Sequence, residues 1–236
     1  MTTPTQIKIC GVTSANDARA CVELGADMIG FNFYRKSSRY IEPADVRRIL
    51  DALPAQICAV GVFVDADRAG IRKVAKTAGV RCVQLHGRTT PESCNELAEE
   101  FRVIRALSTH VRFEPQQTAA FAHCDVLLDA YHPELRGGTG QTCNWSAARA
   151  AMRYTRFLIL SGGLNARNVA RAIAAVTPHG VDVCSGVESA VGTKDHRALE
   201  QFISAVRAVN STHAVSTHKP PAQCHPERSE GSRIIF

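Results

Sequence analysis

The chain has 236 residues, of which 45% are hydrophobic, 21% are charged and 6% are aromatic. These values exclude a disordered or collagen-like chain, and the length allows a large core. The 28 Lys and Arg residues exceed the 22 Asp and Glu residues, which gives a formal net charge of +6. Because the basic residues form no continuous stripe and few aromatic residues stand between them, we do not expect nucleic acid as a partner.

Targeting segments and metal-binding patterns are the next features to consider. No apolar stretch approaches the roughly 20 residues of a membrane span, and the polar start at residues 1–6 lacks a signal peptide's apolar run. We therefore expect a cytoplasmic protein with no membrane partner. The nine cysteines include no C-x-x-C pair, and the histidines include no H-x-x-x-H pair. This spacing predicts neither a disulfide scaffold nor a zinc site, and no metal is expected.

Short β-branched apolar runs alternate with longer segments of helical spacing, which is typical of parallel strands joined by crossover helices. Strands are predicted, in chain order, at residues 6–10, 28–33, 58–64, 81–85, 102–106, 125–129, 157–161 and 181–184. Helices between them are predicted at residues 16–24, 44–53, 67–78, 91–101 and 166–176, with the weakest helical signal at 115–121. Gly25, Gly79 and Gly180 are expected to end helices.

Eight such units in about 200 residues favour a single-domain α/β fold, a closed (β/α)₈ TIM barrel, over an open doubly wound sheet. The sequence CGVT after the first strand also lacks the G-x-G-x-x-G pattern of a dinucleotide site. We predict a catalytic barrel over residues 1–209. Residues 210–236 lose the periodicity and are predicted to be a disordered tail.

Candidate catalytic groups are the polar residues at strand ends, because barrel enzymes place their chemistry at the carboxyl ends of the strands. A period of two puts Lys8 and Cys10 on one face of the first strand, which we expect to be the inner face. A neighbouring cation lowers a thiol's pKa and makes it a useful base, although a buried inert cysteine is the alternative. Asp129 ends the sixth strand, where it is either a catalytic acid or a cap for its own loop.

Two glycine-containing loops predict a phosphate site. Gly162 and Gly163 follow the seventh strand, and Ser185 and Gly186 follow the eighth. Glycines let backbone N–H groups approach an anion, and the start of a short helix near Gly186 would add a positive dipole end. Barrels often hold phosphate at these two loops, whereas the alternative is that the glycines only make tight turns.

Other polar residues are candidates for substrate contact. Gln84 and His86 have the inward parity of the fourth strand, and His86 could also carry a proton. Arg39, in the loop after the second strand, could hold a substrate carboxylate through two hydrogen bonds or be a solvated loop residue. Asp182, inside the eighth strand, is expected to hydrogen-bond loop backbone near the phosphate.

Over about residues 6–208 the sequence resembles the phosphoribosylanthranilate isomerase family. The resemblance rests on an ordered set of short motifs, which is highly specific as a set. They are KICGVT at 8–13, GAD at 25–27 with GF at 30–31, SR at 38–39, QLHG at 84–87, LD at 128–129, GGTG at 137–140 with Trp145, SGGL at 161–164, VDV at 181–183, SGVE at 185–188 and KD at 194–195.

The resemblance implies an Amadori rearrangement of N-(5-phosphoribosyl)anthranilate in tryptophan biosynthesis, with no metal and no cofactor. It implies that Asp129 is the general acid that opens the ribose ring and that Cys10 is the base that removes the proton from ribose C2. Arg39 would hold the anthranilate carboxylate, and the two glycine loops would hold the phosphate. The expected partner is thus a small molecule, and the protein is expected to be a monomer or homodimer.

The chain departs from the family pattern at three places: Ser38 replaces a proline, Cys143 and Asn144 replace a Phe-Asp pair, and Cys184 stands where serine is common. Asn144 is still expected to cap the next helix. The rival predictions are a histidine-pathway sugar isomerase, indoleglycerol-phosphate synthase and a non-catalytic phosphometabolite-binding protein. The first has an aspartate in place of Cys10, the second needs catalytic lysines absent here, and the third needs neither Cys10 nor Asp129.

Overall fold

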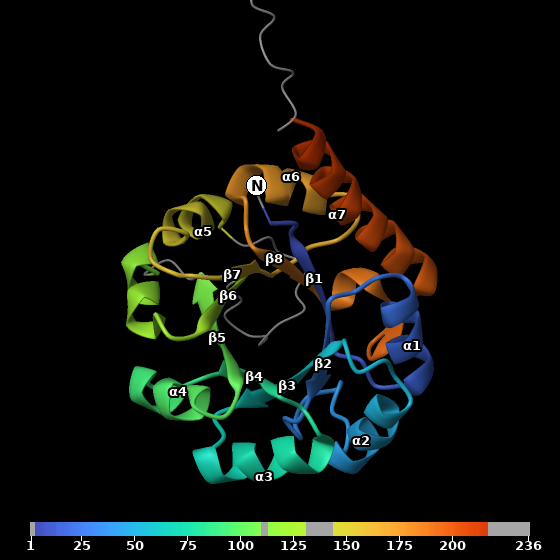
Figure 1. The fold of residues 1–236 in the computed structure, drawn as a ribbon, viewed down its shortest axis with the longest axis vertical. Coiled ribbons are helices and arrows are strands. Elements are labelled where there is room, and N and C mark those ends of the chain that lie inside the picture. Colours follow the sequence, from blue (N-terminus) through green and yellow to red (C-terminus); the bar gives the residue numbers. More distant parts are fainter. Residues whose placement is uncertain (1–2, 110–112, 131–143, 217–236) are drawn as a thin grey trace, which may run out of the picture.

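The computed structural model describes residues 3–109, 113–130 and 144–216. Eight parallel strands form a closed barrel in which each strand pairs with the next and the last pairs with the first (Figure 1). This confirms the predicted (β/α)₈ barrel. The strands are β1 (Gln6–Cys10), β2 (Met28–Asn32), β3 (Cys58–Val64), β4 (Cys82–His86), β5 (Arg102–Thr109), β6 (Asp125–Ala130), β7 (Leu158–Leu160) and β8 (Gly180–Val183).

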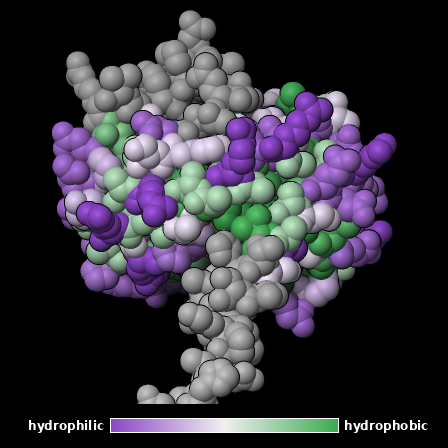
Figure 2. Space-filling model, turned by 90° about the horizontal axis from the view of Figure 1, so that it is seen from above, coloured by the Kyte–Doolittle hydropathy of each residue, from purple (hydrophilic) through white to green (hydrophobic). Residues whose placement is uncertain are grey.

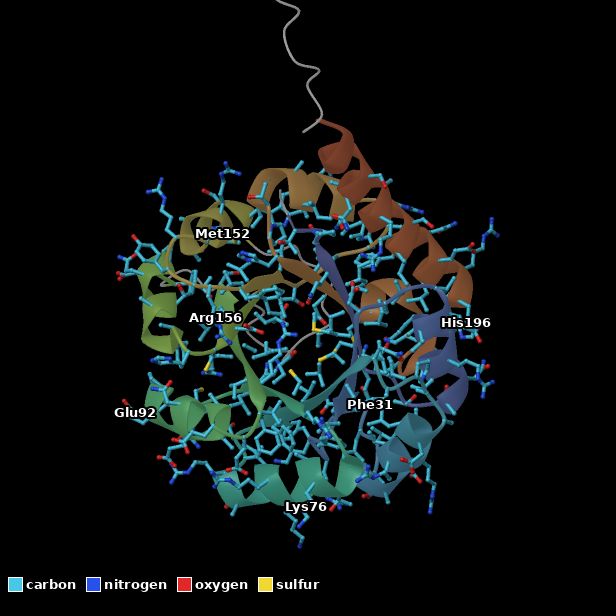
Figure 3. The ribbon with its side chains drawn as sticks, viewed as in Figure 1. Phe31, Lys76, Glu92, Met152, Arg156 and His196 are labelled. Carbon is cyan, nitrogen blue, oxygen red and sulfur yellow. The ribbon has the colours of Figure 1, made fainter. Side chains whose placement is uncertain are left out.

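Helices surround the ring of strands (Figure 1). The α-helices are α1 (Ala15–Glu23), α2 (Pro43–Asp51), α3 (Arg68–Ala78), α4 (Pro91–Ala98), α5 (Trp145–Ala151), α6 (Val169–Val176) and α7 (His196–Ser216). The 3₁₀ helices η1 (Pro115–Phe121) and η2 (Ser185–Val187) and the antiparallel pair β9 (Glu188–Ala190) and β10 (Thr193–Lys194) complete the described elements. Lys76 on α3 and Glu92 on α4 point away from the barrel (Figure 3).

Two apolar layers follow from the alternation of side chains along each strand. Outward residues such as Ile7 and Ile9 pack in the core between strands and helices. Inward residues fill the barrel itself, and this inner cluster consists of Met28, Val60, Cys82, Ile104, Ala106, Leu127 and Ile159. The polar residues of the candidate site also have inward parity, and they lie beyond this inner cluster at the carboxyl ends of the strands.

Helix ends show why these segments form helices where they do. The Asp67 side chain accepts a hydrogen bond from Gly70 N at 2.6 Å and caps α3. Gly79 ends that helix at φ +79°, and a Cβ there would meet the Arg47 guanidinium at 2.6 Å. Asn144 accepts from Ala147 N at 3.1 Å, so the predicted cap of α5 is confirmed.

Some element boundaries differ from the predictions. Gly180 begins β8 rather than ending a helix, because Thr177 takes the left-handed conformation (φ +54°) that closes α6. The weak helical segment at 115–121 is a 3₁₀ helix, and α4 ends at Ala98 rather than at residue 101.

The last helix runs past the boundary predicted at residue 209. α7 continues to Ser216, and Asn210 on this helix accepts a hydrogen bond from Thr5 N at 3.0 Å and donates one to Thr5 O at 3.1 Å. The barrel unit therefore includes residues that the sequence assigned to a tail. Residues 217–236 lie outside the described part of the chain.

The outer surface has the mixed character of a globular protein. On the side that lies at the top of Figure 1, hydrophilic residues cover much of the rim and apolar residues lie between them (Figure 2). Among the described helices, none is both long and apolar enough to cross a membrane.

Candidate active site

The carboxyl end of β1 carries a lysine and a thiol that point into the barrel. Lys8 is fully buried and donates a hydrogen bond to Asp182 Oδ1 at 2.7 Å. A Cβ at Gly30 on the neighbouring strand would lie 3.0 Å from Cys10 Sγ and 3.1 Å from Lys8 Nζ. Both groups therefore sit over Gly30, and the inward parity predicted for Lys8 and Cys10 is confirmed.

The surroundings of Cys10 favour its thiolate. A hydrogen bond with the Cys184 thiol, together with the charges of Lys8 and Lys194, lowers the pKa of Cys10 to about 6 against the opposing effects of burial and Asp182. The same hydrogen bond raises the pKa of Cys184 well above its usual value, so Cys184 remains the proton donor of the pair. At neutral pH Cys10 is thus a base inside the barrel mouth.

Asp182 has different partners from those expected. Its two carboxylate oxygens accept from Lys8 Nζ at 2.7 Å and from Ser161 Oγ at 2.9 Å, so it bridges three strands within the barrel instead of binding loop backbone. The cause is register, because Lys8 pairs with Asp182 across β1 and β8 and both residues have inward parity. Asp182 therefore holds the Lys8 ammonium beside the thiol.

Asp129 lies near the carboxyl end of β6, three strands from β1 around the ring through β7 and β8. Leu127, two residues earlier, belongs to the inner cluster, so Asp129 shares its inward parity. Thr109 Oγ1 donates to the Asp129 carbonyl at 3.0 Å and fixes this strand end to β5. The acid and the thiol thus face the same mouth from well-separated strands.

The two predicted phosphate loops lie against each other. Gly162 and Gly163 adopt φ values of +87° and +63°, which glycine alone adopts readily. A Cβ at Gly186 would overlap the Leu164 carbonyl, so the η2 turn and the β7 loop come together only with glycine at that position. In the described part of the chain, the N–H groups of Gly162, Gly163 and Gly186 donate no hydrogen bond to protein. These N–H groups are suitable donors for an anion.

Neighbouring polar groups hold these loops in place. Asn168 Nδ2 donates to the Gly163 carbonyl at 2.9 Å, and Asn168 is also the residue that precedes α6. Ser185 is the first residue of η2, which begins where the short helix was predicted.

Arg39 belongs to a buried charge cluster that the sequence did not predict. Its Nε and Nη2 donate to the two oxygens of Glu188 at 2.9 and 2.7 Å, and its side chain is 17% exposed. Lys194, with a fully buried side chain, donates to Glu188 Oε1 at 3.0 Å and to the Cys10 carbonyl at 2.6 Å. Arg39 is therefore a fixed residue at the mouth and not a solvated loop arginine.

The sequence analysis gave no role to Glu188 and Lys194, because little in the sequence indicates that they belong to the site. Both stand in the matched motifs, yet they are separated from Arg39 and Cys10 by 149 and 184 residues. Hydrogen bonds from Arg39 and Lys194 and their charges lower the pKa of Glu188 although burial opposes the shift. Glu188 is thus an anion that binds two cations.

Gln84 and His86 lie together at the end of β4. Gln84 Nε2 and His86 Nε2 are 2.7 Å apart, and the buried Oε1 of Gln84 has no hydrogen-bond partner among the described residues. The structure thus places them as a pair with inward parity on a strand of the same barrel. The GGTG motif at 137–140 and Cys143 lie outside the described residues.

Comparison with known proteins shows the family of the chain. Residues 7–205 match the profile of the family described as N-(5'phosphoribosyl)anthranilate (PRA) isomerase. An N-(5'-phosphoribosyl)anthranilate isomerase from Trichlorobacter lovleyi is 43% identical over 198 residues, which are 84% of this chain and 96% of that protein.

Solved structures show the same similarity. The crystal structure of phosphoribosyl anthranilate isomerase from Thermotoga maritima superposes with a TM-score of 0.81 and 42% identity, covering 86% of this chain and 99% of that one. Another structure of a phosphoribosyl anthranilate isomerase, in complex with reduced 1-(o-carboxyphenylamino)-1-deoxyribulose 5-phosphate, gives a TM-score of 0.78 and 39% identity over 86% of this chain and 99% of its own. The resemblance drawn from the motifs is confirmed: the chain belongs to the phosphoribosylanthranilate isomerase family.

Proposed function

We propose that this chain converts N-(5-phosphoribosyl)anthranilate into 1-(2-carboxyphenylamino)-1-deoxyribulose 5-phosphate, the isomerisation step of tryptophan biosynthesis, with Cys10 as base and Asp129 as acid. The observation that carries the assignment of roles is the Cys10 thiol, whose pKa is lowered to about 6 at the same barrel mouth as Asp129. The family supports the reaction, and these positions support the roles.

The first proton transfer opens the sugar ring. Asp129 donates a proton to the furanose ring oxygen while the bond between that oxygen and C1 breaks. The electron pair of the anthranilate nitrogen forms a double bond to C1, which gives an iminium ion. A positioned carboxyl group is a suitable general acid for this step.

The second proton transfer uses the thiolate. The iminium charge acidifies the C2 proton, so a base as weak as the Cys10 thiolate can remove it. The electrons of the C2–H bond form a C1–C2 double bond and the C=N pair returns to nitrogen, which gives the enolamine. The enolamine then takes up a proton at C1 and loses the proton of its C2 hydroxyl, and so becomes the C2 ketone. These steps move protons between protein and substrate and electron pairs within the substrate, so we propose no metal and no cofactor.

The remaining groups position the substrate. The guanidinium of Arg39 has five N–H donors, and Glu188 uses two of them, which leaves donors for the anthranilate carboxylate. The N–H groups of Gly162, Gly163 and Gly186 and residue Ser185 would hold the phosphate. Gln84, His86 and Asp182 complete the proposed binding surface, with Asp182 acting through Lys8 and Ser161.

The test is a direct assay of the purified full chain on N-(5-phosphoribosyl)anthranilate, followed by the loss of anthranilate-ring fluorescence. We expect turnover without added metal and no loss of turnover in the presence of a chelator. Tight binding of the substrate without turnover would instead identify a phosphometabolite-binding protein and contradict the proposal.

We further propose that the step takes place in the cytoplasm with this small molecule as the partner and no part played by nucleic acid. A filter-binding titration with duplex and single-stranded probes at low salt checks the second point. Salt-dependent retention at micromolar protein would contradict it, because phosphate-backbone contacts weaken steeply with salt.

A further inference from the structure

The two sulfur atoms at the mouth are placed to react with each other. Ile9 on β1 pairs in register with Val183 on β8, so the next position along both chains places Cys10 beside Cys184. Adjacent strands lie about 4.8 Å apart, which is within the Cα separation that a disulfide spans. The Cys184 thiol also lowers the pKa of Cys10, as a neighbouring hydrogen-bonding group does, and Cys184 Sγ approaches Glu188 Oε1 at 3.8 Å.

Packing around the pair confines the sulfur atoms. A Cβ at Gly11, between the two strand ends, would lie 2.9 Å from Cys184 Sγ, and a Cβ at Gly30 would lie 3.0 Å from Cys10 Sγ. The glycines therefore leave room for the sulfur atoms and for little more. Because the two residues follow a paired position of β1 and β8, a bond between the sulfur atoms needs rotation of the two side chains without movement of the strands.

The other thiol pairs among the described residues lack this combination of proximity and access. Cys94 and Cys124 are hydrogen-bonded but both fully buried, whereas Cys58 is partly exposed and its partner Cys82 is buried. Cys10 and Cys184 are the pair in which both residues are partly exposed, in the part of the chain that the structure describes. A small oxidant that enters the mouth reaches this pair first.

We propose that Cys10 and Cys184 form a reversible disulfide when the protein meets a peroxide, and that this bond removes the base of the isomerisation. The inference rests on the proposed function for its effect on activity, but not for the bond itself. The bond needs both sulfur atoms, so it can form only in chains that carry a cysteine at each of the two positions.

The chemistry balances with hydrogen peroxide as the oxidant. The Cys10 thiolate attacks one peroxide oxygen; an S–O bond forms, the O–O bond breaks, and hydroxide leaves and is protonated to water. The Cys184 sulfur then attacks the sulfenic sulfur. An S–S bond forms, the S–O bond breaks, and the hydroxyl leaves as water with the Cys184 proton. Both sulfur atoms are oxidised and the peroxide is reduced; a dithiol reverses the reaction.

The experiment exposes the full chain to hydrogen peroxide, traps free thiols by alkylation and maps the peptides by mass spectrometry. We expect a linked peptide that joins Cys10 to Cys184, and an activity loss of more than about tenfold that dithiothreitol restores. In Cys184→Ser no linked peptide can form, and Cys10 goes on to the sulfinic acid, so dithiothreitol does not restore the activity. Each variant is compared with its own untreated sample.

Cys58→Ser is the matched control, because it removes a partly exposed thiol from the opposite end of the barrel. It should lose and regain activity as the unsubstituted chain does. A chain that loses activity without a Cys10–Cys184 link, or a Cys184→Ser variant that recovers as fully as the unsubstituted chain, would overturn the proposal. A link that forms without loss of activity would instead overturn the role of Cys10 in the proposed function and leave the disulfide site standing.

Discussion

The low pKa of Cys10 depends on groups from three parts of the chain. Lys8 on its own strand, Cys184 after β8 and Lys194 on β10 all lower its pKa, while burial and Asp182 raise it. Since no single neighbour is responsible, the balance depends on how closely the strands bring these groups together. The two proton carriers can be tested one at a time.

Cys10→Ala and Asp129→Asn should each lower kcat by about 10²-fold to 10⁴-fold, because each removes one general acid or base. The thermal midpoint should change little in either variant if the loss is chemical. Cys58→Ala, which removes a thiol from the other end of the barrel, is the control and should keep normal turnover. Near-normal kcat in either of the first two variants would show that the assigned role is wrong.

The pH dependence follows from the depressed pKa. The Cys10 thiolate is populated above about pH 6 and is lost below it, so kcat/KM should rise with pH through that value. Cys184→Ala removes the hydrogen bond that lowers the pKa most, so the rise should move to higher pH. Cys184→Ser keeps a donor and should keep the inflection close to 6. Identical pH profiles for the two variants would rule out the hydrogen bond as the cause.

At the scale of elements, η2 and the loop after β7 work as one unit because Gly186 has no side chain. Gly186→Ala would drive a methyl group into the Leu164 carbonyl, push the two loops apart and raise KM by about tenfold or more. Gly180→Ala, at the start of β8, is the matched control, since the nearest atom to its Cβ lies 3.4 Å away. Steady-state kinetics and inhibition by inorganic phosphate measure the effect, and an unchanged KM for Gly186→Ala would exclude the phosphate contact.

The β9–β10 pair supports the mouth through a buried lysine. Lys194→Met should lower the free energy of unfolding by about 3 kcal/mol, because it removes one cation from a buried ion cluster and two backbone carbonyls lose their donor. Lys76→Met, on the exposed side of α3, should stay within about 0.5 kcal/mol of the unsubstituted chain. Urea unfolding compares the two variants, and equal midpoints would show that the cluster adds no stability.

At the scale of the whole molecule, α7 joins the end of the described chain to its beginning. Four apolar residues of α7 are buried in the core: Leu199, Phe202, Ile203 and Val206. Asn210 then makes two hydrogen bonds with Thr5. The closing helix thus fixes the start of β1, the strand that carries Cys10.

A chain that ends after residue 209 should therefore be less stable than one that ends after residue 216, by about 1–3 kcal/mol, because the Thr5 backbone loses both partners. Denaturant unfolding of the two truncated chains measures the difference. Equal stabilities would show that the barrel unit ends at residue 209, as the sequence predicted.

The sequence by itself determined the fold, and it was enough to name Cys10 and Asp129 as the two proton carriers of the proposed reaction. The strand alternation was enough to predict the barrel, the inward parity of Lys8 and Cys10, and strand bounds that agree within a few residues, because these depend on patterns within a few neighbouring residues. It placed the end of α6 correctly at residue 176 but wrongly expected Gly180 to stop the helix, since Thr177 adopts the left-handed conformation that closes it.

Only the tertiary structure decided the partners: Asp182 with Lys8 and Ser161, and Glu188 with Arg39 and Lys194. The Lys8–Asp182 and Arg39–Glu188 pairs join residues that are 174 and 149 positions apart, and they meet because β8 pairs with β1 to close the ring. Ring closure brings distant side chains to within hydrogen-bond distance, whereas sequence periodicity constrains each strand separately.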